Sequence, residues 1–454
     1  MLQKNQIVEL TVERLSNDGN GVGHYQGFAV FVPFSAPGDL LSVKIVKVCA
    51  SYAFGIIEKL LRPSDMRIAD GCPHYQKCGG CQLRHLRYSD ELAAKGAFVS
   101  DAVRRIGGFS VPLSPILPSP QPDRYRNKVQ YPLTKVNGHI QAGFFAGRSH
   151  RVIPCKDCFL QPQLLNQIVE LACHLLEEYH ISVYDEISHT GLVRHIYLRH
   201  GVHSEEVLLC LVINGENLPH ADTFCQRLTE KFPCIKTIVL NINRSRTNVI
   251  LGPQCRILTG PGYIHDTLCG VPVRLDPLSF YQVNTLGAEQ LYQAAAKLAQ
   301  LQSGELVLDL YCGMGTIGLS LAGNAGQVVG VELIPEAIER ARQSAQEMGL
   351  SDKCRFFAAD AGEAAAQLAK EGLRPDVVIL DPPRKGCSPA ALDAVVAMQP
   401  SRIVMVSCNP ATAARDMKYL SAHSYQPAAV QPVDMFPRTK HVEVVIQMTR
   451  RMVL

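Results

Sequence analysis

The sequence contains no apolar run of the about 20 residues that a membrane-spanning helix needs. Its first four residues lack the basic and then apolar pattern of a signal peptide. The net charge is only +4, which is too small to indicate any one class of partner. These absences argue against a membrane-spanning or exported protein, and we expect a cytoplasmic location.

The length of 454 residues exceeds that of an ordinary single domain, so two or three domains are expected. A hydrophobic content of 47% is enough to fill large cores. In a reducing compartment the 16 cysteines should be thiols, metal ligands or catalytic groups rather than disulfides. Their neighbours in the sequence therefore decide which of these roles each cysteine has.

Three segments differ in their pattern of predicted elements. Residues 1–60 combine short strands with Gly and Pro turns, which is typical of a small β-barrel or sandwich. Residues 61–266 mix strand and helix patterns and predict an α+β domain. Within it, residues 93–122 form a helix and a Pro-rich linker that are expected to pack on the following domain. Residues 267–454 alternate strand and helix, which predicts a doubly wound parallel sheet.

A glycine-rich turn follows the first strand of that sheet. Strand 306–310 runs into Gly313-Met-Gly315, and the next strand ends in Glu332. Such a turn lets the backbone approach a ligand closely, and an acid about 20 residues later can bind ribose hydroxyls. The pattern indicates a nucleoside-bearing cofactor, either NAD or S-adenosylmethionine. Asp360 follows another strand, where it could meet the adenine edge or cap a helix, and both interpretations stay open.

Two more side chains are predicted at the same edge of the sheet. Asp381 follows one short apolar strand and Cys408 follows the next, where Asn409-Pro410 breaks the strand. Ligands of open α/β sheets bind at the carboxyl ends of strands. A cysteine there is of no use to a dehydrogenase, which argues against NAD. Glu443 begins a later apolar strand, and its carboxyl should have a raised pKa, as a general base requires.

Cysteines also cluster in the second segment. Cys72, Cys78 and Cys81 lie within ten positions, with glycines that allow a tight wrap. Cys155 and Cys158 form a second pair downstream. Thiolates at such spacing suit a tetrahedral zinc ion or an iron–sulfur cluster. We therefore predict a structural metal site, with either Cys155 or Cys158 as the fourth ligand.

A basic stretch lies between residues 121 and 160, where seven Arg and Lys residues face only two Asp. Such an excess suits a polyanion, and aromatic rings within the stretch could stack on bases. A solvated basic face with core aromatics explains the pattern equally well. The side chains concerned include Arg124, Arg126 and Lys128, with Tyr125, Tyr131, Phe144 and Phe145 as the aromatics.

Taken together, these motifs make the chain resemble the RNA uracil-5-methyltransferases, specifically the bacterial 23S ribosomal RNA type with a TRAM module and a [4Fe-4S] cluster. The resemblance covers nearly the whole length. It rests on the cysteine cluster and on Phe280-Tyr-Gln282-Val-Asn284, Asp309-Leu-Tyr-Cys-Gly-Met-Gly315, Asp381-Pro-Pro-Arg384, Ser407-Cys-Asn-Pro410 and His441-Val-Glu443. The fold implied is an RNA-binding TRAM barrel, an α+β iron–sulfur middle domain and a Rossmann-like methyltransferase domain.

The resemblance also implies roles for single residues. Cys408 would be the nucleophile and Glu443 the base, while Phe280 would stack on a nucleobase. The resemblance favours Cys158 as the fourth cluster ligand. Thr316 departs from the Asn of some relatives, which puts a side-chain contact to the cofactor there in doubt. The residues expected to bind or surround S-adenosylmethionine are Gln282, Tyr311, Gly313, Glu332, Asp360 and Asp381.

The chemistry implied is addition of the Cys408 thiolate to C6 of uracil, methylation at C5 and removal of the C5 proton by Glu443. The target base would have to leave its stack. We expect a monomer acting on 23S rRNA, with Arg124, Arg126 and Lys128 among the RNA contacts. A tRNA uracil-5-methyltransferase, a DNA cytosine-5-methyltransferase and an inactive RNA-binding protein are the alternatives.

Overall fold

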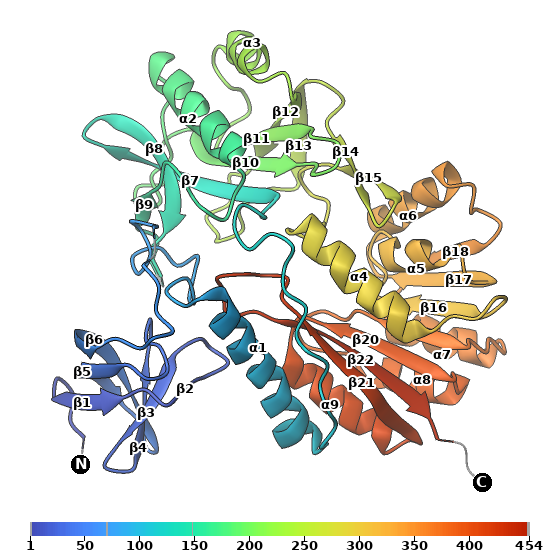
Figure 1. Cartoon of the computed structure of the whole chain (residues 1–454). Coiled ribbons are helices and arrows are strands. Elements are labelled where there is room, and N and C mark those ends of the chain that lie inside the picture. Colours follow the sequence, from blue (N-terminus) through green and yellow to red (C-terminus); the bar gives the residue numbers. More distant parts are fainter. Residues whose placement is uncertain (1, 70, 148, 452–454) are drawn as a thin grey trace.

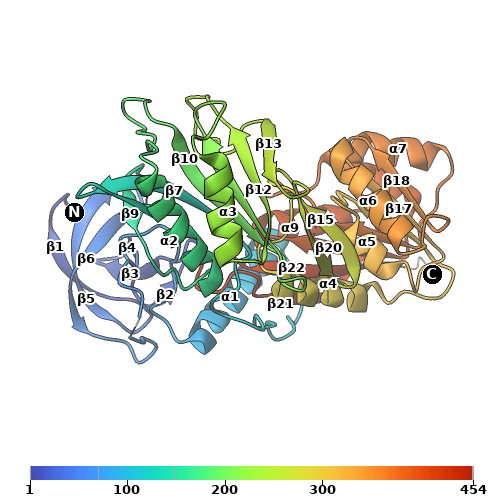
Figure 2. The ribbon, with the colours of Figure 1, turned by 90° about the horizontal axis from the view of Figure 1, so that it is seen from above.

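The computed structural model describes residues 2–69, 71–147 and 149–451. The chain forms an N-terminal barrel, a central domain and a C-terminal α/β domain (Figure 1). Figure 2 shows the barrel at one end of the molecule and the β17–β18 edge of the C-terminal sheet at the other. In the described part of the chain, no helix combines the length and the apolar character needed to cross a bilayer.

The N-terminal barrel consists of six strands whose alternating side chains fill a small core. The inward side chains are mostly Val, Leu and Ile, such as Val30, Val43 and Ile45. Its order is β1-β5-β6-β4-β3-β2. The strands are β1 (Ile7–Thr11), β2 (Arg14–Leu15), β3 (Gly21–Tyr25), β4 (Phe28–Val32), β5 (Leu40–Val48) and β6 (Tyr52–Arg62).

The central domain is a mixed seven-stranded sheet in the order β13-β12-β11-β10-β7-β8-β9. Two helices, α2 (Gln163–Glu178) and α3 (Ala221–Lys231), cover one face, and the other face packs toward the C-terminal domain through Tyr197 and Leu208. The strands are β7 (Lys128–Val136), β8 (His139–Phe145), β9 (Val152–Pro154), β10 (Val193–His200), β11 (Val207–Ile213), β12 (Ile235–Ile242) and β13 (Gln254–Thr259). A hairpin, β14 (Ile264–Leu268) and β15 (Val271–Leu275), leads into the last domain.

The C-terminal domain has a seven-stranded sheet between two helical layers, in the order β18-β17-β16-β19-β20-β22-β21. All neighbours pair in parallel except β22, which is antiparallel to both of its neighbours. The strands are β16 (Leu306–Leu310), β17 (Gln327–Glu332), β18 (Cys354–Ala358), β19 (Val377–Leu380), β20 (Arg402–Ser407), β21 (Tyr425–Val433) and β22 (Glu443–Arg450).

Successive side chains of these strands enter different cores, because a strand alternates its faces. Val307 packs with the layer of α4, α5 and α6, whereas Leu308 packs with the layer of α7, α8 and α9. The helices are α4 (Thr285–Ala299), α5 (Thr316–Leu321), α6 (Pro335–Glu347), α7 (Ala361–Lys370), α8 (Pro389–Met398) and α9 (Pro410–Ser421).

One helix from the N-terminal half completes the second layer. Helix α1 (Tyr88–Ala102) and the π-helical turn η1 (Val103–Gly107) lie beside α9 (Figure 1), and Val99 and Val103 join the core there. The linker that follows runs along β21, where the Leu117 N–H donates to the carbonyl of Pro432 at 3.0 Å.

A buried ionic network fixes α1 to the C-terminal domain. The Lys95 ammonium is fully buried and donates to Glu91 at 2.8 Å and to Asp434 at 2.7 Å. Arg438 donates its backbone N–H to Glu91 at 2.6 Å, and the Tyr88 hydroxyl donates to Asp434 at 2.8 Å. Charges removed from water this far are tolerated only when they are paired, so the network determines one docking geometry.

We expect Lys95→Met to lower the free energy of unfolding by about 3–5 kcal/mol, because two carboxylates stay buried without their cation. Urea unfolding followed by circular dichroism measures this change. Lys297→Met on the exposed face of α4 is the matched control and should change stability little. Equal effects of the two substitutions would show that the network adds nothing to docking.

Candidate active site

The candidate site lies at the carboxyl edge of the C-terminal sheet, where the strand order reverses between β16 and β19. From β16 the chain continues to one side of the sheet and from β19 to the other, which opens a crevice between the loops that follow the two strands. The loops after β16, β17, β19 and β20 meet there, as the sequence predicts. The Asp381 N–H donates to the Leu310 carbonyl at 3.3 Å, and Asn409 Nδ2 donates to the Arg384 carbonyl at 3.1 Å.

The turn after β16 is shaped for a close approach by a ligand. Tyr311, Gly313 and Gly315 have φ values of 64°, 55° and 72°, a left-handed conformation that glycine adopts without strain. A side chain at Gly313 would meet nothing within 4 Å, so the backbone there faces open space. At Gly315 a Cβ would lie 2.8 Å from the ring of Phe356, so only glycine fits.

Glu332 is held beside this turn at the end of β17. Its carboxylate accepts the Gly313 N–H at 3.2 Å and the Ile334 N–H at 3.1 Å. Both bonds fix the carboxylate across the turn, where an acid of this kind binds ribose hydroxyls. Leu333 and Ile334 next to it are 62% and 51% exposed, which provides an apolar surface for a flat ring.

Asp309 is an acid to which the sequence motifs assign no role. Its side chain is fully buried in β16, and Oδ2 accepts the Gly318 N–H at 2.9 Å while Oδ1 has no partner among the described residues. Burial raises the pKa of Asp309 to about 8. The sequence does show an acid inside an apolar strand. Such a residue indicates a structural hydrogen bond, because a buried carboxyl needs a partner.

Asp360 accepts the N–H groups of Gly362 at 2.8 Å and Glu363 at 3.1 Å, so it is the N-cap of α7. The capping interpretation is confirmed, and the adenine contact stays a prediction. Thr316 is buried. Burial raises the pKa of the Tyr292 hydroxyl, whereas the side chains of Thr316 and Gln282 both lower it, so these two side chains lie near the same ring.

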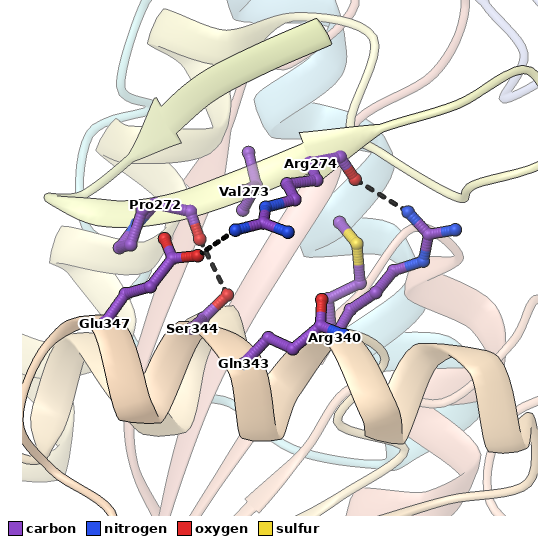
Figure 3. A pocket seen from close by; sticks show the side chains of 8 residues that line it. Pro272, Val273, Arg274, Arg340, Gln343, Ser344 and Glu347 are labelled. Atoms are coloured by element: carbon purple, nitrogen blue, oxygen red, sulfur yellow. Dashed lines mark hydrogen bonds and ion pairs between the residues drawn. The ribbon is translucent and has the colours of Figure 1, made fainter. Parts of the chain in front are cut away.

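The loop from Asp276 to Asn284, which carries Phe280 and Gln282, is anchored at its start by the seam between β15 and α6 (Figure 3). Ser344 donates to the Pro272 carbonyl at 2.7 Å, and Arg274 pairs with Glu347 at 2.6 Å. Arg340 donates to the Arg274 carbonyl at 2.8 Å and pairs with Asp276. The crevice in this seam is only about 10 Å³, which is too small for a nucleoside.

The central domain holds the rest of that loop. Asn127 donates to the Gln282 carbonyl at 2.8 Å, and Arg199 donates to the Ser279 carbonyl. Phe280 lies between these anchors and is 72% exposed. An exposed aromatic ring on a clamped loop is suited to stacking against another ring.

Cys408 lies on the turn between β20 and α9, with Arg384, Asp381 and Glu443 around it. Burial raises the pKa of the Cys408 thiol, and the negative charges of Glu443 and Asp381 raise it further. The positive charge of the neighbouring Arg384 guanidinium acts in the opposite direction. Arg384 was visible in the sequence only as part of a motif. Its position shows that it is the cation able to stabilise a thiolate at this site.

Glu443 begins β22 with its side chain buried. Burial raises the pKa of Glu443 to about 8, and the Asp381 charge adds to the effect. Exclusion of water likewise raises the pKa of Asp381 to about 7. The raised pKa expected for Glu443 is therefore confirmed. A carboxyl with this pKa can exchange a proton near neutral pH, which is the property of a general base.

The cysteines of the second segment gather beside the loop that precedes Glu443. Burial raises the pKa of Cys78, and the neighbouring thiols of Cys158 and Cys72 raise it further. The neighbouring Cys155 thiol and the backbone N–H groups of Leu160 and Gln161 lower the pKa of Cys158. Burial raises the pKa of Cys81, and the positive charge of Arg84 partly offsets this effect.

Within the described ranges, no three His, Cys, Asp or Glu side chains stand close enough together to hold a metal ion. The chemistry of the donors nevertheless fits a thiolate-bound group, because the thiols of Cys72, Cys78, Cys81 and Cys158 are near enough to raise one another's pKa. The choice of Cys158 over Cys155 as the fourth ligand still rests on the resemblance.

The basic stretch divides into paired and unpaired cations. Arg124 pairs with Asp157 at 2.5 Å and donates to the Cys158 carbonyl at 2.9 Å, so its charge is already neutralised. Arg126 and Lys128 have no ion-pair partner within the ranges that the structure describes, and both are half-buried. Base stacking by the two tyrosines of this stretch is excluded, because Tyr125 and Tyr131 are 4% and 0% exposed.

Comparison with known proteins gives two family-model matches. Residues 271–451 match the model of tRNA (Uracil-5-)-methyltransferase, and residues 2–57 match that of the TRAM domain. An uncharacterised RNA methyltransferase of Halalkalibacterium halodurans is 41% identical over 445 residues, which are 98% of this chain and 97% of that protein. One of Listeria innocua is 41% identical over 449 residues, covering 99% of each chain.

A solved structure matches over the whole fold. It is the crystal structure of Pyrococcus abyssi tRNA (uracil-54, C5)-methyltransferase in complex with S-adenosyl-L-homocysteine. The TM-score is 0.78 at 29% sequence identity, and the match covers 97% of this chain and 100% of that one.

Charge substitutions around Cys408 should change how fast its thiol reacts with iodoacetamide. Above pH 8, where the Glu443 carboxyl with its pKa of about 8 is ionised, Arg384→Gln should slow alkylation and Glu443→Gln should accelerate it. Each change should be roughly three- to tenfold, as pKa shifts of about half to one unit would produce. Peptide mass spectrometry measures the rate, with the exposed Cys255 as the internal reference. Rates that move in the same direction in both variants would contradict this electrostatic arrangement.

Proposed function

Because the chain belongs to the RNA uracil-5-methyltransferase family, we propose that it methylates C5 of a uridine in 23S rRNA, using Cys408 and Glu443. The observation that carries this proposal is the group formed by Cys408, Arg384 and Glu443. It joins a thiol, a cation that stabilises its thiolate and a carboxyl with a pKa of about 8. Thiolate addition to a pyrimidine needs the first two groups, and removal of the C5 proton after methyl transfer needs the third.

S-adenosylmethionine supplies an electrophilic methyl group when it is bound. Of the residues that would hold it, Gly313 and Glu332 line the turn after β16, and Gln282 and Asp381 reach the crevice from two other loops. Tyr311 shapes the same turn through its positive φ. The open space at Gly313 and the fixed Glu332 carboxylate fit a nucleoside with a free ribose diol.

The chain's own residues then move one proton and form one transient bond. The Cys408 sulfur bonds to C6 of uracil, which places the electron pair of the C5–C6 double bond on C5 for attack on the methyl group. Glu443 takes the proton from C5, and the electron pair of that C–H bond restores the double bond as the C6–S bond breaks. Cys408 leaves as a thiolate, which the Arg384 guanidinium stabilises.

The RNA substrate has two candidates. We assign 23S rRNA from the sequence motifs, whereas the solved relative with the same fold is a tRNA methyltransferase. Both substrates present uridines in loops, where a base can leave its stack at low cost. Phe280, exposed on its clamped loop, is the ring on which a neighbouring base would stack.

We also propose that Cys72, Cys78, Cys81 and Cys158 hold a [4Fe-4S] cluster. The clustered spacing of these cysteines and the mutual effect of their thiols on one another's pKa support this assignment. The role of the cluster would be to order the loops around it. Four thiolate bonds would tie residues 72–81 to the loop that precedes α2.

The substrate is tested by nucleoside mass spectrometry of purified 23S rRNA and tRNA from cells with and without the gene. We expect 5-methyluridine to disappear from 23S rRNA at one or more positions and to return with the wild-type gene but not with Cys408→Ala. Loss from tRNA alone would assign the tRNA substrate instead. Unchanged 5-methyluridine in both RNAs would overturn the proposed activity.

Two substitutions should stop the reaction at different steps. Cys408→Ala should give neither product nor covalent complex, because the sulfur that attacks C6 is missing. Glu443→Gln keeps the side-chain size but cannot accept the C5 proton, so RNA should remain bonded to Cys408. With radiolabelled cofactor, denaturing gel electrophoresis should show a labelled protein–RNA band only for Glu443→Gln. The double variant is the control, and wild-type turnover by Glu443→Gln would exclude Glu443 as the base.

Anaerobically purified protein should be brown and contain four iron and four sulfide ions per chain, as a [4Fe-4S] cluster requires. Cys78→Ser should remove most of this iron and lower the melting temperature. Cys255→Ser, at an exposed thiol on the edge strand β13, is the matched control and should keep both. Zinc without iron or sulfide in the wild-type protein would rule the cluster out.

A further inference from the structure

Two cations lie side by side on neighbouring strands of the central sheet. Lys128 of β7 lies directly opposite Arg199 of β10 in their antiparallel register. Like charges at opposed positions destabilise a pair of strands. Arg126, two residues before Lys128, adds a third positive charge, close enough to lower the pKa of Lys128. The arrangement therefore costs stability in the free protein, and the fold must gain something from it elsewhere.

No acid of the described residues forms an ion pair with Lys128, Arg199 or Arg126. The Arg199 guanidinium is buried, and its hydrogen bonds to described residues go to two neutral oxygens, the Tyr197 hydroxyl and the Ser279 carbonyl. The side chain of Arg126 donates to the Lys128 carbonyl at 3.1 Å. Burial first, and then the charges of Arg199 and Arg126, lower the pKa of Lys128 to about 8. Buried cations in proteins are otherwise paired, so an anion is the missing partner.

The group adjoins the loop that carries Phe280. Arg199 donates to the carbonyl of Ser279, the residue before Phe280. Burial lowers the pKa of His441, two residues before Glu443, and the positive charges of Arg384 and Arg126 both lower it further. An anion bound by the three cations would therefore lie next to the Phe280 loop.

We propose that Lys128 and Arg199, flanked by Arg126, form a site for one phosphodiester group of the RNA backbone next to the target uridine. This assignment rests on the proposed function for the identity of the RNA. The bound phosphate supplies the negative charge that the opposed cations lack, so RNA binding relieves a repulsion present in the free protein. The site thereby couples backbone binding in the central domain to placement of the base in the C-terminal domain.

The test compares Lys128→Gln with Lys135→Gln, an exposed lysine on the same strand β7. Binding of a short oligouridylate and of a 23S rRNA transcript is measured by fluorescence at several salt concentrations. Lys128→Gln should weaken binding several-fold and reduce the slope of log K against log salt by about 0.7–1, the share of one phosphate contact. Lys135→Gln should leave the slope unchanged. Arg199 is not replaced, because it also holds the Phe280 loop.

A second measurement separates a binding role from a structural one. Without RNA, the melting temperature of Lys128→Gln should equal or exceed that of the wild type, because one of two opposed charges has been removed. A lower melting temperature with an unchanged salt slope would overturn the proposal and assign Lys128 to the fold. The slope is read without catalysis, so it stands even if no uridine proves to be methylated.

A third measurement addresses the other anion available, the carboxylate of S-adenosylmethionine. Calorimetric affinity for the cofactor should be the same in Lys128→Gln and in the wild type. A tenfold loss of cofactor affinity, with RNA binding unchanged, would show that the cations face the cofactor and would refute the phosphodiester assignment.

Discussion

The contact between the Lys95 ammonium and the carboxylates of Glu91 and Asp434 is the constraint on which the active site depends. It joins a helix from the N-terminal half to the loop that runs from β21 to Glu443. Arg438 in the same loop pairs with Asp123 at 3.1 Å and accepts the backbone N–H groups of Gln82 and Leu83 at 3.0 Å. The loop that leads to Glu443 is thus held by contacts with α1, with Asp123 of the linker and with Gln82 and Leu83 of the cysteine-containing segment. Its position is a property of the whole chain rather than of the C-terminal domain.

Exclusion of water has different effects at two places in this fold. Around Lys95 each charge must be paired, because an unpaired charge there could not be solvated by water. Around Cys408 and Glu443 it instead holds protons on groups that would otherwise be ionised or only weakly basic. The first effect gives the site a fixed shape, and the second gives it groups that exchange protons near neutral pH.

The sequence predicted best what depends on local pattern. The five parallel strands from β16 to β20 lie where apolar runs placed them, and the turn at Cys408 follows from Asn409-Pro410. Helix α1 begins at Tyr88, earlier than the predicted residue 93, because its first turn is held by tertiary contacts to Asp434. Local pattern cannot supply such partners.

The same reason explains what was missed or wrong at the site. Arg384 and Asp309 act through groups on other elements, namely the Cys408 thiol and the Gly318 N–H in α5. Tyr125 and Tyr131 resemble stacking residues in the sequence but point into the core. Arg124 and Lys128 are both basic residues of the same stretch, yet of these two only Arg124 forms an ion pair with a described acid, Asp157. Whether a cation is paired is decided by packing, which the sequence alone does not record.

The linkage of α1 to Asp434 also sets the order in which the chain can complete its fold. The two partners are 339 residues apart in the sequence, so on the ribosome α1 emerges long before Asp434 exists. Closing so long a loop is slow, and the contact order of the C-terminal domain is correspondingly high. Until Asp434 has been synthesised, the charged side chain of Lys95 remains exposed on α1. This charge keeps that face of the helix hydrated, whereas an apolar side chain there would favour aggregation. A lysine at the centre of the interface therefore suits an intermediate that has to remain open until the last strands are made.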